Sequence, residues 1–164
     1  MDWGRDLRAK IPGAPNFTYR EMIRSDTALR LGILNMPDEL EWRRIEHLAA
    51  EVLQPIRSEF GRITMLSGFR TVRLCKAVGS SEKSYHAFGG AGDIEPYDAS
   101  IGLFDVLEWI SENIDYNELI AEYFPEGWVH VGKIDGDNRK ILKLKDPYHN
   151  FEQVSLAYIG SIYG

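Results

Sequence analysis

A histidine and an aspartate, His86 and Asp93, bracket a run of small residues in this chain of 164 residues. The glycines between them let the backbone turn back without a Cβ clash, so the imidazole and the carboxylate can point at one centre. A third ligand is then needed, and His130 lies in the sequence Trp-Val-His-Val-Gly, whose alternation puts Trp128 and His130 on one face of a strand. Two histidine nitrogens and one carboxylate oxygen suit Zn²⁺, and three protein ligands leave a fourth position for water, as in catalytic zinc sites.

Each of these three residues also has a purely structural interpretation. His86 can be a loop histidine, Asp93 a turn or cap residue, and His130 a hydrogen-bonded histidine of the core. For any one residue alone the structural interpretation is the more common one. The three together, within their sequence context, favour a metal site.

Composition limits the classes of function. The chain has 19 Lys and Arg against 25 Asp and Glu, and its net charge of -6 argues against a protein that neutralises nucleic-acid phosphates or binds a membrane surface. The N-terminal residues lack the apolar segment of a secretory signal, and no later run approaches the roughly 20 apolar residues of a membrane span. We therefore expect a protein that is made in the cytoplasm without a signal peptide and does not insert into a membrane.

The elements that must position these residues include helices recognisable by apolar spacing and end signals. Thr18 and Glu21 fit a capping box at the start of a short helix. Apolar residues recur at steps of three and four over residues 38–60, which predicts a long helix that Pro55 kinks and Gly61 ends. Shorter helices are predicted over residues 71–78 and 101–113.

Strands are predicted over residues 63–66, 91–94, 119–123, 128–134 and 141–144, and the sequence Asp-Gly-Asp-Asn at 135–138 is typical of a hairpin turn. No break in composition divides the chain, so we expect one domain over residues 1–145, and this order of elements is compatible with an α+β fold. Residues 146–164 are rich in tyrosine and have no clear period, so we expect a C-terminal tail that docks a partner.

Three motifs follow one another along the chain: Ser67-Gly68-Phe69-Arg70, the pattern S-x-H-x-x-G-x-A-x-D over residues 84–93, and Trp128-Val129-His130. In this order and spacing they resemble the zinc D-Ala-D-Ala carboxypeptidase family of peptidoglycan peptidases, particularly its phage-type members. The likeness runs from about Asn16 to Gly132. It implies the hedgehog/DD-peptidase fold, in which helices flank a small antiparallel sheet, and it implies that His86, Asp93 and His130 are the zinc ligands.

The resemblance also implies a catalytic carboxylate. The sequence Leu-Ile-Ala-Glu ending at Glu122 resembles the strand that carries the catalytic glutamate in phage-type and hedgehog-like members, and pairing with the next strand would bring Glu122 near His130. Some relatives place an acid three residues before the last histidine, where this chain has Gly127. Glu126 is therefore the second candidate, because it shares strand parity with His130. For both glutamates the alternative is an exposed charge near a turn.

Arg70 and Ser84 are the predicted substrate contacts. Arg70 follows a strand and a Ser-Gly pair, a position from which a guanidinium can hold a carboxylate at two points. In relatives the matching arginine holds substrate or polarises the attacked carbonyl, and a surface salt bridge is the alternative. Ser84 precedes His86 by two residues and can contact substrate or groups behind the ligands, although a turn hydroxyl is nearly as good an interpretation.

These interpretations predict a zinc metallopeptidase that cleaves peptidoglycan stem peptides, as a D-Ala-type endopeptidase or a carboxypeptidase, with Glu122 as the base and no organic cofactor. We expect it to be phage-encoded and to act at the bacterial wall, either as an endolysin released at lysis or on a virion. The alternative is a zinc-stabilised virion or tail protein without catalysis, which uses the same fold for binding and contacts phage structural proteins through residues 146–164.

Overall fold

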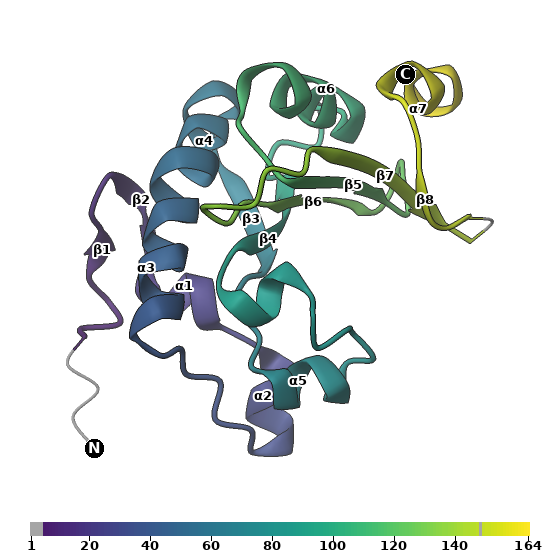
Figure 1. Cartoon of the computed structure of the whole chain (residues 1–164). Helices are drawn as coiled ribbons and strands as arrows, with labels where there is room; N and C mark the ends of the chain where they lie inside the picture. Colours follow the sequence, from purple (N-terminus) through teal and green to yellow (C-terminus); the bar gives the residue numbers. More distant parts are fainter. Residues whose placement is uncertain (1–4, 148) are drawn as a thin grey trace.

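A computed structural model describes residues 5–147 and 149–164 (Figure 1). At its centre is a six-stranded sheet in the order β3-β4-β6-β5-β7-β8. The strands are β3 Ile63–Ser67, β4 Ala91–Pro96, β5 Glu118–Glu122, β6 Trp128–Gly132, β7 Ile141–Asp146 and β8 His149–Gln153. All neighbouring strands are antiparallel except β5 and β7. The expected α+β class, with helices flanking a mainly antiparallel sheet, is confirmed.

The connection from β6 to β7 differs from the expected hairpin. The chain crosses over, and β7 joins the far side of β5 in a parallel register that pairs Glu122 with Lys145. A buried asparagine holds the crossover, because Asn117 Nδ2 donates to the carbonyl oxygens of Asp137 and Arg139 at 2.6 and 3.1 Å. The prediction of a hairpin at residues 135–138 was therefore wrong. These residues belong to the crossover between β6 and β7, and the side chain of Asn117, which is distant in the sequence, stabilises them there.

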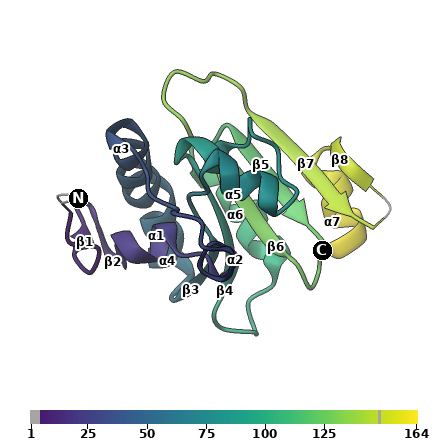
Figure 2. The ribbon, with the colours of Figure 1, turned by 90° about the horizontal axis from the view of Figure 1, so that it is seen from below.

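Helices cover both faces of the sheet (Figures 1 and 2). Helix α6 (Leu103–Asn113) packs on one face, where its buried side chains join those of β5 and β6 in the main core. Helix α5 (Val72–Ala77) and the short 3₁₀ helix η2 (Tyr85–Phe88) lie on the other side. Because strand side chains alternate, the residues of β5 and β6 that do not face α6 point toward η2.

The predicted long helix is present as one rod of three segments, α3 (Glu39–Leu48), the π-helical η1 (Ala49–Leu53) and α4 (Gln54–Phe60) (Figure 1). The π-helical segment ends at Leu53, two residues before Pro55, which cannot donate to a helical hydrogen bond. The kink at Pro55 stays a prediction. Gly61, with φ of 73°, ends the rod as predicted.

The N-terminal elements pack against this rod. Strands β1 (Lys10–Ile11) and β2 (Ala14–Thr18) form a small antiparallel sheet. Helix α1 (Tyr19–Ile23) follows, and both bonds of the predicted capping box between Thr18 and Glu21 are present. Helix α2 (Asp26–Leu31) then leads toward α3.

The last residues belong to the fold. Strand β8 extends the sheet beside β7, and helix α7 (Leu156–Tyr163) packs against α6, where a Cβ on Gly160 would lie 2.9 Å from the ring of Phe104. The hydroxyl of Tyr163 donates to Asp146 Oδ2 at 2.8 Å. Docking of a partner by residues 146–164 stays a prediction. None of the helices in the described ranges combines the length and apolarity needed to cross a membrane.

Candidate metal centre

The side chains of His86, Asp93 and His130 meet at one point. Asp93 Oδ1 lies 3.1 Å from His86 Nε2 and 2.8 Å from His130 Nδ1, and these two nitrogens are 3.2 Å apart. All three residues are buried, and one ligand atom from each lies within 4.8 Å of the others. The three predicted residues thus offer two nitrogens and one oxygen to a single centre, a donor set that suits a metal ion such as zinc.

Neighbouring strands and a tight turn bring these side chains together. Asp93 on β4 and His130 on β6 are directly paired in the antiparallel register, so they share a face. His86 comes from η2, which ends at Gly89 with φ of 77°. A Cβ on Gly89 would lie 2.6 Å from the carbonyl oxygen of Glu41 in α3. The turn between the first two ligands therefore requires glycine, as the sequence indicated.

The segment Ser67–Arg70 orients the first histidine through its backbone. His86 Nδ1 donates to the carbonyl oxygen of Gly68 at 2.6 Å, which leaves Nε2 free of its proton and facing the centre. The N–H of Arg70 donates to the carbonyl oxygen of His86 at 3.1 Å. A Cβ on Gly68 would lie 2.2 Å from the carbonyl oxygen of Met22, so glycine is needed there as well. This orientation of His86 fits a metal ligand.

Asn35 holds the same segment and was missed by the sequence analysis. Its buried amide donates to the carbonyl oxygens of Ile23 and Phe69 at 2.8 and 2.9 Å, and its Oδ1 accepts the N–H of Thr71 at 2.8 Å. Asn35 thereby joins the end of α1 to the loop between β3 and α5. Nothing in the local sequence marks this asparagine, because its partners come from two distant segments.

The charges of the three residues are coupled. Burial lowers the pKa of His86, whereas the neighbouring imidazoles of His86 and His130 hold the pKa of Asp93 well below its usual range in spite of burial. Burial also opposes protonation of His130, but Asp93 and Glu118 outweigh it and raise the pKa of His130 to about 9. The Asp93 carboxylate therefore stays ionised between the two imidazoles, and it holds the proton of His130 together with Glu118. A cation that binds Nδ1 of His130 must displace that proton.

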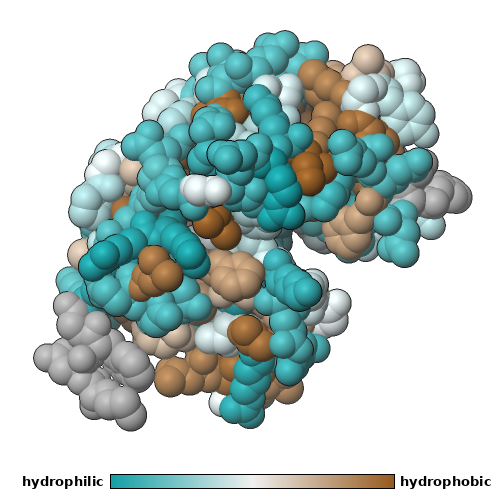
Figure 3. All heavy atoms as spheres, in the orientation of Figure 1, coloured by the Kyte–Doolittle hydropathy of each residue, from teal (hydrophilic) through white to brown (hydrophobic). Residues whose placement is uncertain are grey.

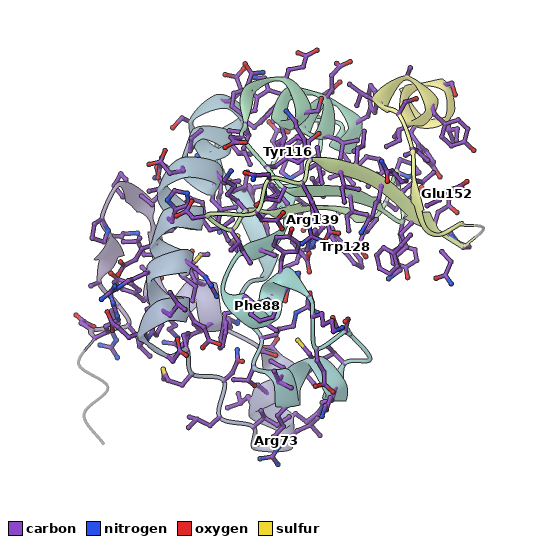
Figure 4. All side chains as sticks on the ribbon, in the orientation of Figure 1. Arg73, Phe88, Tyr116, Trp128, Arg139 and Glu152 are labelled. Carbon is purple, nitrogen blue, oxygen red and sulfur yellow. The ribbon has the colours of Figure 1, made fainter. Side chains whose placement is uncertain are left out.

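A pocket of about 630 Å³ opens over this centre, between residues 78–86 and the sheet. Figure 3 shows the surface hollowed between the part that carries β7 and β8 and the part that carries α2 and α5. Trp128 and Arg139 lie on the side of the sheet that faces this hollow, whereas Arg73 lies far from it (Figure 4). The pocket lining includes all the predicted site residues: Arg70, Ser84, His86, Asp93, Glu122 and His130.

A family model described as peptidase M15 matches residues 15–132, which is most of the chain and contains every predicted site residue. The chain belongs to the peptidase M15 family. The resemblance to the zinc D-Ala-D-Ala carboxypeptidases is confirmed at this level, while membership of a phage-type group stays a prediction. A comparison with curated proteins found no match. Strands β7 and β8 and helix α7 lie beyond the matched residues.

In this M15 peptidase chain the two candidate bases differ in position. Glu122 is 7% exposed and lines the pocket, whereas Glu126 is exposed in the turn between β5 and β6. At Gly127, where some relatives carry an acid, a Cβ would lie 1.7 Å from the carbonyl oxygen of Glu122. This backbone therefore has no room for a side chain at that position, and the geometry favours Glu122. Burial and the charge of Asp93 raise the pKa of Glu122.

Arg70 and Ser84 take different places in the pocket. Arg70 lines the pocket with its Nη2 3.4 Å from Asp93 Oδ2, while its Nε is buried and has no hydrogen-bond partner among the described residues. Ser84 Oγ accepts the N–H of His86 at 3.3 Å and caps η2. That bond agrees with the turn-hydroxyl interpretation, and contact of either residue with substrate stays a prediction.

Five further charged residues line the pocket and were missed, and three of them, Glu118, Lys143 and Lys145, come from neighbouring strands of the sheet. Glu118 shares a strand face with Glu122 at a spacing of two residues, so the alternation of β5 could have indicated it. Lys143 and Lys145 come from β7 and pair with these two glutamates. The sequence carried no signal for the lysines, because they reach the pocket only through the crossover.

Proposed function

We propose that this chain is a zinc-dependent metallopeptidase that hydrolyses a peptide bond in the stem peptides of bacterial peptidoglycan, as a D-Ala-type endopeptidase or carboxypeptidase. The observation that carries the proposal is the buried cluster of His86, Asp93 and His130 at the pocket, in a chain of the M15 peptidase family. The motifs shared with phage-type members support a setting in phage lysis or on a virion.

The residues around the cluster fit such a reaction. His86 Nε2, Asp93 Oδ1 and His130 Nδ1 would hold the zinc ion. When bound, zinc supplies Lewis-acid polarisation of the scissile carbonyl and activation of water. Glu122 then accepts the proton of the attacking water and returns it to the leaving amine, a role that its raised pKa favours because a base must also act as an acid.

Arg70 supplies the second interaction with substrate. Its place in the pocket lining, beside Asp93, allows the guanidinium to hold a substrate carboxylate or the oxygen that gains charge during attack. Five basic residues and three acidic residues line the pocket, in a chain whose net charge is -6. This local excess of positive charge favours an anionic peptide such as a stem peptide with free carboxylates.

The experiment is digestion of peptidoglycan sacculi of several wall chemistries by the purified, zinc-loaded protein, with mass analysis of the released fragments. We expect cleavage by the wild type and by Glu126→Gln, and loss of cleavage in Glu122→Gln with zinc content unchanged. Glu126→Gln is the matched control, because the same substitution falls on the exposed turn. Intact sacculi after treatment with zinc-loaded wild type would instead favour a zinc-stabilised structural or binding protein.

A further inference from the structure

His130 turns its second ring nitrogen away from the metal centre and toward β5. While Nδ1 faces Asp93, Nε2 is buried and makes no hydrogen bond of good geometry with any described residue. A carboxylate oxygen, Oε1 of Glu118, lies 3.4 Å from this nitrogen. Because Ile120 is directly opposite His130, Glu118 is its diagonal neighbour on the same face of the sheet.

Glu118 is itself held from the other side. Its second oxygen, Oε2, accepts a hydrogen bond from the amine of Lys143 on β7. The side chains of His130, Glu118 and Lys143 are 5, 16 and 25% exposed, so this line of charges becomes more buried toward the centre. It crosses β7, β5 and β6, and it ends at the metal centre. Lys143 lies outside the residues that match the family model.

The tautomers of histidine explain how the contact with Glu118 can act on the metal centre. A neutral histidine that offers Nδ1 to a metal must carry its proton on Nε2. A buried N–H without an acceptor is costly, and a carboxylate acceptor at this position fixes both the tautomer and the ring orientation of a metal ligand. Since Nε2 and Oε1 already face each other, a small rotation of either side chain closes the 3.4 Å gap to a hydrogen bond.

We propose that Glu118 is a positioning residue of the metal centre. Its carboxylate accepts a hydrogen bond from the Nε2–H of His130 and so keeps Nδ1 directed at the centre, while Lys143 keeps the carboxylate in place. The inference rests on the proposed zinc function for the identity of the metal, but it does not depend on peptide hydrolysis.

The test measures the zinc dissociation constant by competition with a chromophoric chelator. For Glu118→Leu, which removes the acceptor, we expect zinc affinity to fall about 10–100-fold, the usual cost of losing such a partner. Glu118→Gln retains an acceptor oxygen and should lose less, and Lys143→Met should shift affinity in the same direction. Glu112→Leu is the control, because Glu112 is exposed on α6.

A second readout is the ¹⁵N NMR spectrum of histidine-labelled, zinc-loaded protein. We expect one His130 tautomer with a slowly exchanging Nε2 proton in the wild type, and faster exchange of that proton in Glu118→Leu. Wild-type affinity and unchanged His130 signals in Glu118→Leu would overturn the inference. If Glu118→Leu does not fold, the graded effects of Glu118→Gln and Lys143→Met decide. Zinc affinity that depends on Glu118 without any cleavage of sacculi would refute only the proposed hydrolysis.

Discussion

The amine of Lys145 lies 3.5 Å from Oε2 of Glu122, its partner in the parallel register of β5 and β7. The rings of Tyr123 and Phe151 flank this amine, with centroids 5.1 and 4.2 Å away. Tyr123 and Phe151 are also the non-glycine residues with positive φ in the described ranges, at 55° and 53°. Such backbone is costly for these residues, so the fold stores strain where it places two rings on the amine beside the proposed base.

Replacing Lys145 should change the ionisation of Glu122. Three groups act on this carboxyl from the neighbouring strands: Asp93 raises its pKa, whereas His130 and Lys145 lower it. Lys145→Met removes one positive charge, so the pKa of Glu122 should rise further. The acid limb of kcat/KM against pH should then move to higher pH, and a shift of one unit lowers activity on that limb about tenfold.

The measurement is the pH profile of the zinc-loaded protein, with Lys140→Met as control. Lys140 also lies over a tyrosine ring, with its amine 4.8 Å from the centroid of Tyr116, but it does not line the pocket. Its profile should match the wild type. A Lys145→Met profile that stays in place or moves to lower pH would contradict the role of this lysine.

The predictable parts of the site are those encoded by local sequence. The glycine-rich turn between His86 and Asp93 and the alternation around His130 are properties of short segments, so all three candidate ligands could be named from residue types and spacing. The long helix was predictable for the same reason, because its apolar face repeats at helical spacing. Glu122 was within reach, since the short turn after it folds β6 back onto β5.

The residues that support the site could not be predicted in this way. Asn35 acts on a loop more than thirty positions away, at Phe69 and Thr71, through hydrogen bonds that leave no periodic pattern. Lys145 reaches Glu122 only because β7 crosses over β5. A hairpin at residues 135–138 would place β7 beside β6, so the predicted hairpin gave no indication that Lys145 contacts Glu122.

Arg70 should be sensitive even to a change that keeps its charge. A lysine at this position offers a point charge, without the planar fork that approaches Asp93 through Nη2. We expect Arg70→Lys to lower kcat/KM for stem-peptide hydrolysis about 10–100-fold, a loss of about 1.4–2.7 kcal/mol in transition-state stabilisation. Arg73→Lys is the control, because Arg73 lies far from the pocket (Figure 4). If the two variants had the same kcat/KM, Arg70 would have no role in the proposed reaction.

Asn35→Ala should destabilise the fold and the metal centre together. The change leaves the carbonyl oxygens of Ile23 and Phe69 and the N–H of Thr71 without their side-chain partner in a buried region. We expect the free energy of unfolding to fall by roughly 2–5 kcal/mol, as several buried polar groups lose their partners. Denaturant unfolding measures this loss.

Asn113→Ala provides the comparison for Asn35. Asn113 also donates from Nδ2 to a backbone carbonyl, that of Trp109 at 2.9 Å, but it is exposed. Its replacement should cost less than about 1 kcal/mol, because water can take over the freed carbonyl. Similar losses for the two asparagines would show that Asn35 is not the tie between α1 and the Gly68–Thr71 segment.

As pH rises, the stability of the metal-free protein should fall and the affinity of the protein for zinc should rise, both because of His130. The contacts of His130 with Asp93 and Glu118 overcome the effect of burial and raise its pKa from 6.5 to about 9. A pKa that is higher in the folded state contributes stability that is complete below 6.5 and disappears as pH rises through 9. The metal-free protein should therefore lose roughly 2–4 kcal/mol of unfolding free energy over this range. Zinc replaces that proton at Nδ1, so zinc affinity should instead increase as pH rises toward 9.

Denaturant unfolding at several pH values, with and without zinc, measures the first effect. Calorimetric titration of zinc in buffers of different ionisation enthalpy measures the second, and near pH 7.5 about one proton should be released per zinc bound. His47 is the comparison for the imidazole: its Nε2 lies 3.2 Å from the exposed Asp135 Oδ1, outside the cluster. His47→Gln should therefore leave proton release unchanged. Zinc binding without proton release at this pH would mean that His130 is already neutral in the metal-free protein. Asp93 and Glu118 would then not raise the pKa of His130 as expected.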